Sequence, residues 1–247
     1  MPAMSTLVSP LLSSSAFPAS AAFNSSRAVV IGASAAGLPA LLQVCSALPA
    51  GLDAPVLVVL HIGAHPSQLA QMLDQRCALP TRFAVDGEAV EAGRIYVAAP
   101  DHHLLLMPGT VRVSRGPKEN WTRPAIDPLF RSAALHWGER AVGVLLAGQM
   151  DDGTAGLRAI KERGGIAIVQ DPTTAEDSSM PRSALDNVAV DHCLPPAEIS
   201  AYLLQLTRSP PGPAAPPHRR SCCAKWQSAR TRTPAWRTSQ PWAALPH

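Results

Sequence analysis

The chain has 247 residues, and 47% of them are hydrophobic, which is enough to fill the core of one domain or of a small pair of domains. Its net charge of +3 is unevenly distributed along the sequence. Residues 28–207 hold 13 Lys and Arg and all 18 Asp and Glu, which gives this part a net charge of −5. Residues 208–247 hold 7 basic residues and no acidic one. The acidic central part excludes a nucleic-acid binder on charge grounds, and apolar runs far shorter than the ~20 residues of a membrane helix exclude insertion into a bilayer.

Both ends of the chain differ in composition from its centre. Residues 1–26 are rich in Ser and Ala and carry no charge, so they lack the basic start of a signal peptide and predict a disordered leader. Residues 208–247 contain eight prolines and show no hydrophobic periodicity. This composition predicts a disordered, basic, proline-rich tail, with contact to acidic surfaces as the functional alternative. The five cysteines are odd in number and lack the spacing of a metal site, which is typical of reduced thiols in the cytoplasm.

The first structured segment, residues 28–47, is predicted to form a strand, a turn and a helix. Residues 29–31 are β-branched and apolar, as in a buried parallel strand, and the Ala- and Leu-rich residues 36–45 indicate a helix. The turn Gly32-Ala-Ser-Ala-Ala-Gly37 places Ser34 at the carboxyl edge of the sheet, where open α/β folds bind ligands. Taken alone, this turn is compatible with a nucleophilic serine, with a nucleotide-binding loop and with a purely structural turn.

Later segments continue the alternation of strands and helices. Apolar runs bounded by turn residues predict buried strands at residues 55–60, 141–148, 166–170 and 188–193. Helical spacing of apolar residues predicts helices at residues 66–73, 126–138, 155–163, 181–185 and 199–206. Residues 82–115 instead contain short strands separated by glycines, which predicts hairpins. The expected fold class is therefore α/β, with one doubly wound, mainly parallel sheet, helices on both faces and an inserted β-hairpin region.

Three polar positions lie where predicted buried strands end: Ser34, His61 and the pair Asp151-Asp152. Because the carboxyl ends of parallel strands share one edge of the sheet, these side chains are expected to converge. Serine needs an adjacent base to become a nucleophile, histidine titrates near neutral pH, and a carboxylate orients the imidazole. The set therefore predicts a Ser-His-Asp hydrolase, although its chain order differs from the Ser-Asp-His order of α/β-hydrolases and no G-x-S-x-G motif surrounds the serine.

Other assignments compete for the same residues. His61 and His65 are spaced as a metal-binding pair on a helix, but Gly63 and Pro66 argue against a helix there, so no metal site is expected. The adjacent residues His102 and His103 are predicted to lie on a hairpin surface or, as the alternative, to line the site.

The acidic residues also have structural alternatives. One member of the pair Asp151-Asp152 is expected to cap the helix that follows, which leaves the other for chemistry. Asp127 follows Arg123-Pro124 and is expected to cap the helix at residues 126–138.

Seven short motifs resemble, in order, the catalytic domain of the chemotaxis protein-glutamate methylesterases (CheB-like). The resemblance covers about residues 27–206 and lies in Gly32-Ala-Ser-Ala-Ala-Gly37, Val59-Leu-His-Ile62, Gly93-Arg-Ile-Tyr-Val-Ala-Ala-Pro100, Arg123-Pro-Ala-Ile-Asp127, Leu129-Phe130, Leu146-Ala-Gly-Gln-Met-Asp-Asp-Gly153 and Met180-Pro-Arg182. It implies a doubly wound α/β domain with serine esterase activity on methyl glutamates of receptor helices, often with deamidation of receptor glutamines. No cofactor and no metal are expected.

By position, the resemblance implies Ser34 as nucleophile, His61 as base, Asp152 as orienting acid and the backbone N–H of Gln149 as oxyanion donor. The chain departs from the family at two turns. Ala36 replaces the first of two glycines after the serine, and Gln149-Met150 stands where the family has Met-Gly, so this loop must turn without its second glycine.

The resemblance also sets the expected domain organisation: a leader at residues 1–26, a catalytic domain at residues 27–207 and a tail at residues 208–247. A leader of this length is too short for the phosphoacceptor domain of many members, so a stand-alone cytoplasmic enzyme is expected, with methyl-accepting receptor helices as partners. Two alternatives remain at this point: an esterase for another substrate, and an inactive or nucleotide-binding Rossmann-like interaction module.

Overall fold

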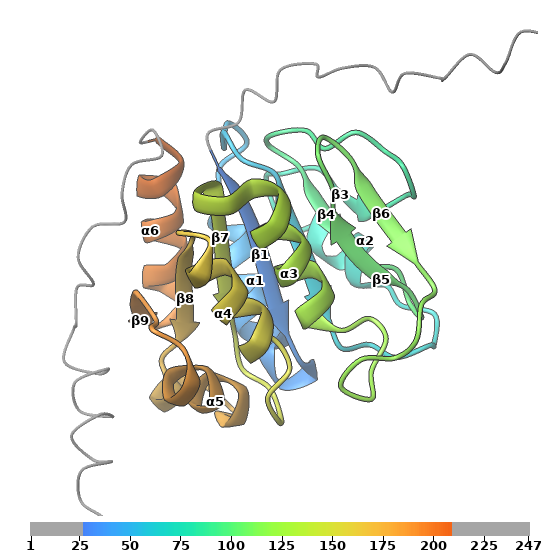
Figure 1. Ribbon diagram of the computed structural model, residues 1–247. Coiled ribbons are helices and arrows are strands. Elements are labelled where there is room, and N and C mark those ends of the chain that lie inside the picture. The colour runs from blue at the N-terminus through green and yellow to red at the C-terminus, as the bar shows by residue number, and fades with distance from the viewer. Residues whose placement is uncertain (1–26, 209–247) are drawn as a thin grey trace, which may run out of the picture.

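The computed structural model describes residues 27–208, which form one α/β domain (Figure 1). The leader at residues 1–26 and the tail after Arg208 lie outside the described residues, so the expectations for them stay predictions. Within residues 27–208 no helix is long and apolar enough to cross a membrane.

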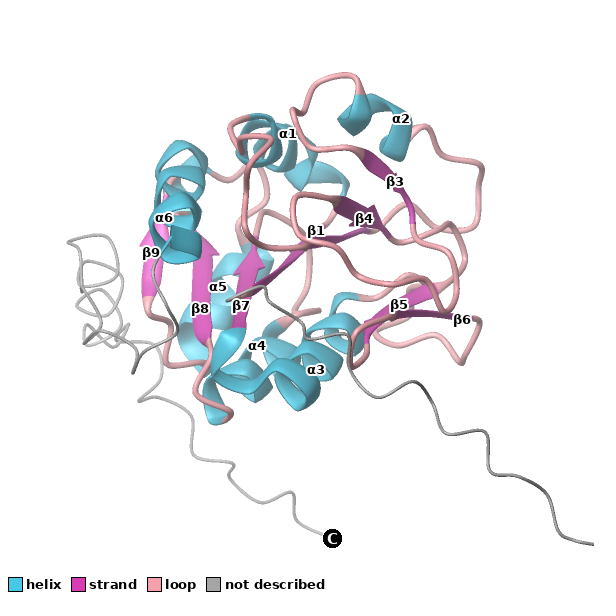
Figure 2. Ribbon diagram, turned by 90° about the horizontal axis from the view of Figure 1, so that it is seen from above, coloured by secondary structure: helices cyan, strands magenta, loops and turns pink. Residues whose placement is uncertain are grey.

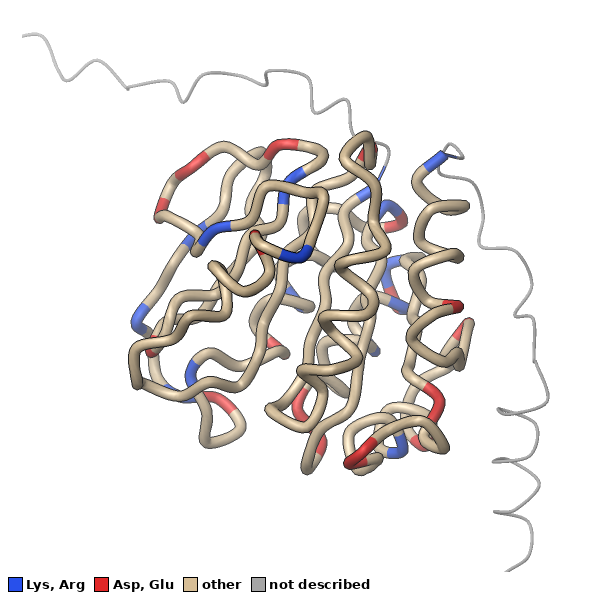
Figure 3. The backbone as a smooth tube through the Cα atoms, turned by 180° about the vertical axis from the view of Figure 1, so that it is seen from behind, with Lys and Arg blue, Asp and Glu red and all other residues tan. Residues whose placement is uncertain are grey.

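Seven parallel strands form the central sheet in the order β3-β4-β2-β1-β7-β8-β9. Their bounds are Ala28–Ala33 (β1), Val56–Leu60 (β2), Thr81–Phe83 (β3), Ile95–Val97 (β4), Ala141–Leu145 (β7), Ile166–Gln170 (β8) and His192–Leu194 (β9). The central strands β1, β2, β7 and β8 are buried throughout and carry no Lys, Arg, Asp or Glu, so charged residues lie toward loops and helices (Figure 3). A sheet covered on both faces requires such continuous apolar strands, and the predicted fold class is confirmed.

Helices cover both faces of this sheet (Figure 2). The α-helices are Leu38–Ser46 (α1), Leu69–Asp74 (α2), Ile126–Trp137 (α3), Thr154–Glu162 (α4), Ser179–Asn187 (α5) and Pro196–Arg208 (α6), and the 3-10 turns are Ala35–Gly37 (η1), Gly138–Arg140 (η2) and Pro172–Thr174 (η3). Alternate residues of β1 enter opposite cores: Val29 and Ile31 pack with α1, α2 and α6, whereas Val30 packs with α3, α4 and α5.

The extent of the hairpin region was predicted wrongly. Thr81–Phe83 and Ile95–Val97 pair in parallel within the main sheet, and only β5 (His103–Leu106) and β6 (Val111–Ser114) form an antiparallel hairpin. The glycines that separate these strands indicate turns equally well in both arrangements, so local sequence does not distinguish them. The hairpin packs on α3, where Ser132 Oγ accepts a hydrogen bond of 2.9 Å from the Leu106 N–H.

Helices α3 and α4 pack against each other at Gly156, where a side chain would not fit. A Cβ at Gly156 would lie 2.5 Å from Phe130 Cβ and 3.1 Å from the Asp127 carbonyl oxygen. Both contacts involve atoms near the backbone of α3, which cannot swing away as the end of a long side chain would. The spacing of the two helices, and with it the position of the loops at their N-termini, depends on this glycine.

We expect Gly156→Ala to lower the free energy of unfolding by about 2 kcal/mol, because overpacking a tight contact typically costs 1–3 kcal/mol. Urea unfolding of the purified protein measures the change. Gly51→Ala is the matched control, since a Cβ at Gly51 meets nothing within 4 Å. Equal stability of the two variants would show that α3 and α4 can separate at little cost.

Candidate active site

Ser34 follows β1 at the carboxyl edge of the sheet, as predicted. Its backbone N–H donates to the Ala147 carbonyl oxygen at 3.1 Å, and its own carbonyl oxygen accepts from the Gly37 N–H at 2.8 Å, which closes the turn η1. Its hydroxyl does not cap η1, so turn formation does not use it. A Cβ at Gly37 would lie 2.5 Å from the Ala147 carbonyl oxygen, whereas Ala36 is accommodated half-buried in η1. The substitution at position 36 therefore leaves the turn intact.

His61 lies beside Ser34 because of the register between β1 and β2. Ala33 pairs with Leu60, and the His61 N–H continues the ladder by donating to the Ala33 carbonyl oxygen at 3.1 Å. Ser34 and His61 are thus the next positions on adjacent strands, whose backbones are about 4.8 Å apart. Within the described residues no hydrogen bond joins their side chains.

Asp152 completes the cluster through a direct contact. His61 Nε2 and Asp152 Oδ2 lie 2.8 Å apart, and their side chains are 18% and 3% exposed. A carboxylate only accepts hydrogen bonds, so Nε2 carries the proton and Nδ1 is the ring nitrogen left for another partner. The structure therefore brings the predicted histidine and acid together across 91 residues of sequence.

Asp152 accepts hydrogen bonds from four donors. Its Oδ2 accepts from the Ile126 N–H at 2.7 Å besides His61, and its Oδ1 accepts from Asn120 Nδ2 at 2.6 Å and from the Asp127 N–H at 3.1 Å. Burial alone would raise the pKa of Asp152, but the hydrogen bonds from His61, Ile126 and Asn120 outweigh it and place this pKa below its ordinary value. Asp152 is therefore ionised at neutral pH.

The two helix caps were assigned to the wrong acids. Asp127 does not cap its own helix: it lies inside the first turn of α3, and its Oδ1 accepts the Gly156 N–H of α4 at 2.7 Å. The N-terminus of α3 is instead capped by Asp152. Asp151 is exposed, and the N-cap position of α4 is Gly153, which has no side chain to cap the helix. Each acid caps the neighbouring helix, which sequence spacing cannot reveal.

The loop at residues 147–150 forms the wall beside Ser34. A Cβ at Gly148 would lie 2.6 Å from Ser34 Cβ and 2.4 Å from Met180 Sδ, so only glycine fits. The Gly148 N–H donates to the Asp177 carbonyl oxygen at 3.0 Å, whereas the Gln149 N–H has no acceptor among residues 27–208. Met150 makes the turn with φ of +66° and a 63% exposed side chain. The loop therefore keeps its bend without the family's second glycine.

Asn120 belongs to the site but was missed in the sequence. It lies in an irregular segment between β6 and α3, where Asn120 and Trp121 have φ of +49° and +63°. Asparagine tolerates this left-handed conformation, and that tolerance was the only local signal. Nothing in its spacing pointed to Asp152, which is 32 residues away.

The structure also places His65 and His103, for which the sequence left alternatives open. Residues 61–65 do not form a helix, His65 is exposed, and within residues 27–208 no three His, Cys, Asp or Glu side chains are grouped to hold a metal ion. His103 was predicted to lie on the hairpin surface or to line the site, but it is 4% exposed and bonds to two backbone groups, the Pro117 carbonyl oxygen and the Ala125 N–H. It is a structural residue because both of its ring nitrogens are occupied.

Comparisons with known proteins identify this arrangement. The family model described as CheB methylesterase matches residues 29–203. The chain is 38% identical over 185 residues to a putative protein-glutamate methylesterase/protein-glutamine glutaminase of Leptospira interrogans, an alignment that covers 74% of this chain and 96% of the relative. A similarly named protein of Anaeromyxobacter dehalogenans is 43% identical over 181 residues, which cover 73% of this chain but only 53% of that relative.

A solved structure agrees with these sequence matches. The crystal structure of the Thermotoga maritima CheB methylesterase catalytic domain superimposes with a TM-score of 0.69 at 34% sequence identity, covering 73% of this chain and 98% of that one. The shared part is therefore the region that contains the central sheet and the cluster of Ser34, His61 and Asp152.

We expect Met150→Gly to raise the free energy of unfolding by about 1 kcal/mol, because a left-handed conformation costs a residue with a Cβ roughly 1–2 kcal/mol. Thermal or urea unfolding measures it. Asp151→Gly, at an exposed position without positive φ, is the control and should lower stability. Destabilisation by Met150→Gly would mean that the methionine side chain makes a compensating contact.

Proposed function

The chain belongs to the CheB methylesterase family, and from this premise we propose that it hydrolyses the methyl esters of glutamyl side chains on chemotaxis receptors, with Ser34, His61 and Asp152 as a catalytic triad. The observation that carries the proposal is the 2.8 Å contact between His61 Nε2 and Asp152 Oδ2. The same histidine follows β2 at the position next to Ser34, which follows the adjacent strand β1. The names of the relatives support the substrate class.

The roles of the two ring nitrogens of His61 determine the acylation step. Asp152 holds the Nε2–H of His61, which leaves Nδ1 to take the proton of Ser34. The Ser34 oxygen then attacks the ester carbonyl carbon, and the backbone N–H of Gln149 is the proposed donor to the developing oxyanion. His61 returns the proton to the methoxy group, so methanol leaves and a glutamyl ester of Ser34 remains.

Deacylation uses the same groups, with water as the nucleophile and the Ser34 oxygen as the leaving group. A water molecule gives its proton to His61 Nδ1 and attacks the acyl carbon, and the Ser34 oxygen leaves with that proton, so a glutamate carboxylate is released. The relatives' names also include protein-glutamine glutaminase. For an amide substrate the leaving group is ammonia, and the same proton from His61 is needed. We propose this second reaction on the same residues.

A nucleotide-binding module fits the geometry less well. A pyrophosphate at the first βα turn needs free backbone N–H groups and a close backbone approach. Here the Ser34 N–H already donates to Ala147, and Ser34 Cβ packs against Gly148. The proposed enzyme acts in the cytoplasm, which agrees with Cys45 and Cys77 as free thiols in one core.

We expect Ser34→Ala and His61→Ala to abolish release of methanol from membranes that carry a methylated chemotaxis receptor. Both residues lie at turns and are partly exposed, so the fold should persist and the free energy of unfolding should change by less than about 1 kcal/mol. Near-normal turnover by Ser34→Ala would exclude the triad. Loss of folding in that variant would indicate that the serine is structural.

The two adjacent acids give a second test. We expect Asp152→Asn to lower kcat at least about 100-fold, roughly 2.7 kcal/mol of transition-state stabilisation, because an amide does not stabilise the imidazolium. Asp151→Asn should cost less than about 1 kcal/mol, since Asp151 is exposed and caps no helix through its side chain. Steady-state rates decide: the reverse ranking would assign the acid to Asp151, and equal small losses would mean that neither completes a triad.

A further inference from the structure

Two buried carboxylates lie side by side beneath the proposed site, and one amide bridges them. Asn120 Nδ2 donates to Asp152 Oδ1 at 2.6 Å and to Asp127 Oδ2 at 3.0 Å. Both carboxyl groups also accept backbone N–H bonds, Asp152 from α3 and Asp127 from α4. Since carboxylates only accept, the amide must present its NH2 group here, and its carbonyl oxygen in that place would repel both.

The bridge offsets an electrostatic conflict. Burial and the neighbouring charge of Asp152 raise the pKa of Asp127 above its ordinary value, and the hydrogen bonds from Gly156 and Asn120 offset only part of this rise. The same amide helps to keep the pKa of Asp152 below its ordinary value. Without Asn120, Oδ1 of Asp152 would keep only the Asp127 N–H at 3.1 Å, the longest of its four hydrogen bonds. Oδ1 would then be held by that one long bond, so the carboxylate would be less firmly fixed against His61.

The segment that carries Asn120 is held in place by its own contacts. Glu119 and Thr122 exchange backbone hydrogen bonds of 3.2 and 2.9 Å around the turn at Asn120 and Trp121. This turn directs the Asn120 amide inward, while the Trp121 side chain is 88% exposed. The amide is therefore aimed by backbone geometry and not by apolar packing of its neighbour.

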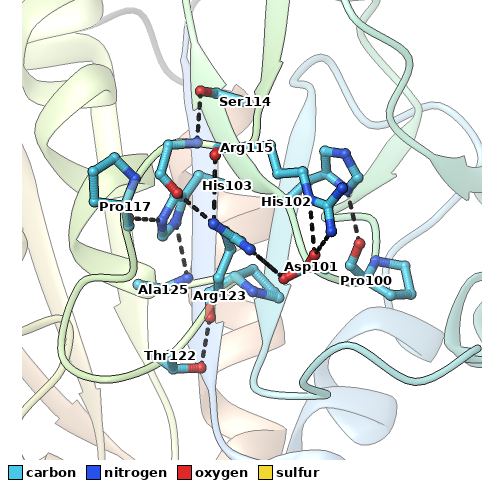
Figure 4. Close-up of polar contacts among 12 residues, drawn as sticks. Pro100, Asp101, His102, His103, Ser114, Arg115, Pro117, Thr122, Arg123 and Ala125 are labelled. Atoms are coloured by element: carbon cyan, nitrogen blue, oxygen red, sulfur yellow. Dashed lines mark hydrogen bonds and ion pairs between the residues drawn. The ribbon is translucent and has the colours of Figure 1, made fainter.

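A clamp of one acid and two arginines anchors the same segment (Figure 4). Arg123 donates to Asp101 Oδ1 at 2.9 and 2.6 Å, and Arg115 donates to Asp101 Oδ2 at 2.9 and 2.6 Å. Arg123 also donates to the Gly116 carbonyl oxygen at 2.6 Å. His103 joins the segment to α3 by donating to the Pro117 carbonyl oxygen and accepting from the Ala125 N–H. These bonds fix both ends of the stretch that presents Asn120.

We propose that Asn120 is a positioning residue of the esterase, which locks the Asp152 carboxylate against His61, and that the clamp of Asp101, Arg115 and Arg123 holds Asn120 in place. The proposal rests on the proposed function. Asn120 touches no reacting atom, so its loss changes the alignment of the imidazole while the substrate still binds. The expected consequence is a lower kcat at an unchanged KM.

The direct test is Asn120→Ala, assayed by methanol release from receptor membranes. We expect kcat to fall at least about 10-fold, as for loss of a hydrogen bond to a charged group, with KM within about 2-fold. Asn120→Asp keeps the shape but replaces the donor with a third carboxylate, so its kcat should fall at least as far. Asn187→Ala is the matched control, because its amide donates to the Ser183 carbonyl oxygen within α5, and it should keep the wild-type rate.

A double-mutant cycle separates positioning from general destabilisation. In the Asp152→Asn background, Asn120→Ala should have no further effect on kcat, because its action passes through that carboxylate. Likewise, Asp101→Ala should lower kcat in the wild-type chain but not in the Asn120→Ala background. Equal losses in both backgrounds would overturn the proposal, as would a wild-type kcat for Asn120→Ala. If Asn120→Ala fails to fold in urea titration, Asn120→Ser, which adds no charge and is too short to bridge both carboxylates, carries the same cycle.

An NMR measurement separates this inference from the proposed function. In protein with 15N-labelled histidine, the Nε2–H proton of His61, assigned by its loss in His61→Ala, should be protected from exchange. It should broaden or vanish in Asn120→Ala and persist in Asn187→Ala. If the wild-type chain released no methanol, the proposed methylesterase activity would be refuted, but the NMR result could still be interpreted. A protected proton in Asn120→Ala would refute the positioning role alone.

Discussion

The structure depends on an exchange of caps between two helices. The first N–H groups of α3 donate to Asp152, which precedes α4, while a N–H of the first turn of α4 donates to Asp127 of α3. A helix N-terminus leaves several donors without partners and carries a positive dipole end, so a buried carboxylate stabilises it strongly. Gly156 allows the two helices to approach closely enough for this exchange. Removal of either carboxylate would leave buried N–H groups without acceptors.

The proposed catalytic acid therefore also has a structural role. The α3 N–H groups and the Asn120 amide together hold the Asp152 carboxylate against His61 before any substrate arrives, so the alignment of His61 requires no reorganisation during the reaction. The contribution of Asp152 to stability depends on pH. Because the pKa of Asp152 lies below its ordinary value of about 3.9, its ionised form stabilises the fold fully above that value, and this contribution is lost as the pH falls toward the lower folded pKa.

Sequence reasoning succeeded where a local pattern sets the structure. Apolar β-branched runs identified the central strands, and their ends located Ser34, His61 and Asp152, because strand ends in a parallel sheet share one edge. It failed where a role depends on a distant partner. β3 and β4 resemble hairpin strands until their parallel pairing is known. Asn120 acts across 32 residues from an irregular turn, and no periodicity marks such a contact.

The order Ser-His-Asp along the chain follows from the strand order of the sheet. β1 lies between β2 and β7, so the chain leaves β1 in one direction toward β2 and later returns on its other side with β7. Open α/β sheets bind ligands outside the carboxyl ends of the strands at such a reversal, and Ser34, His61 and Asp152 follow β1, β2 and β7 in turn. Any order of three side chains at such a reversal can converge, because convergence requires adjacent strand ends and not adjacent sequence. The departure from the α/β-hydrolase order therefore reflects a different placement of strands and leaves the chemistry of the proposed triad unchanged.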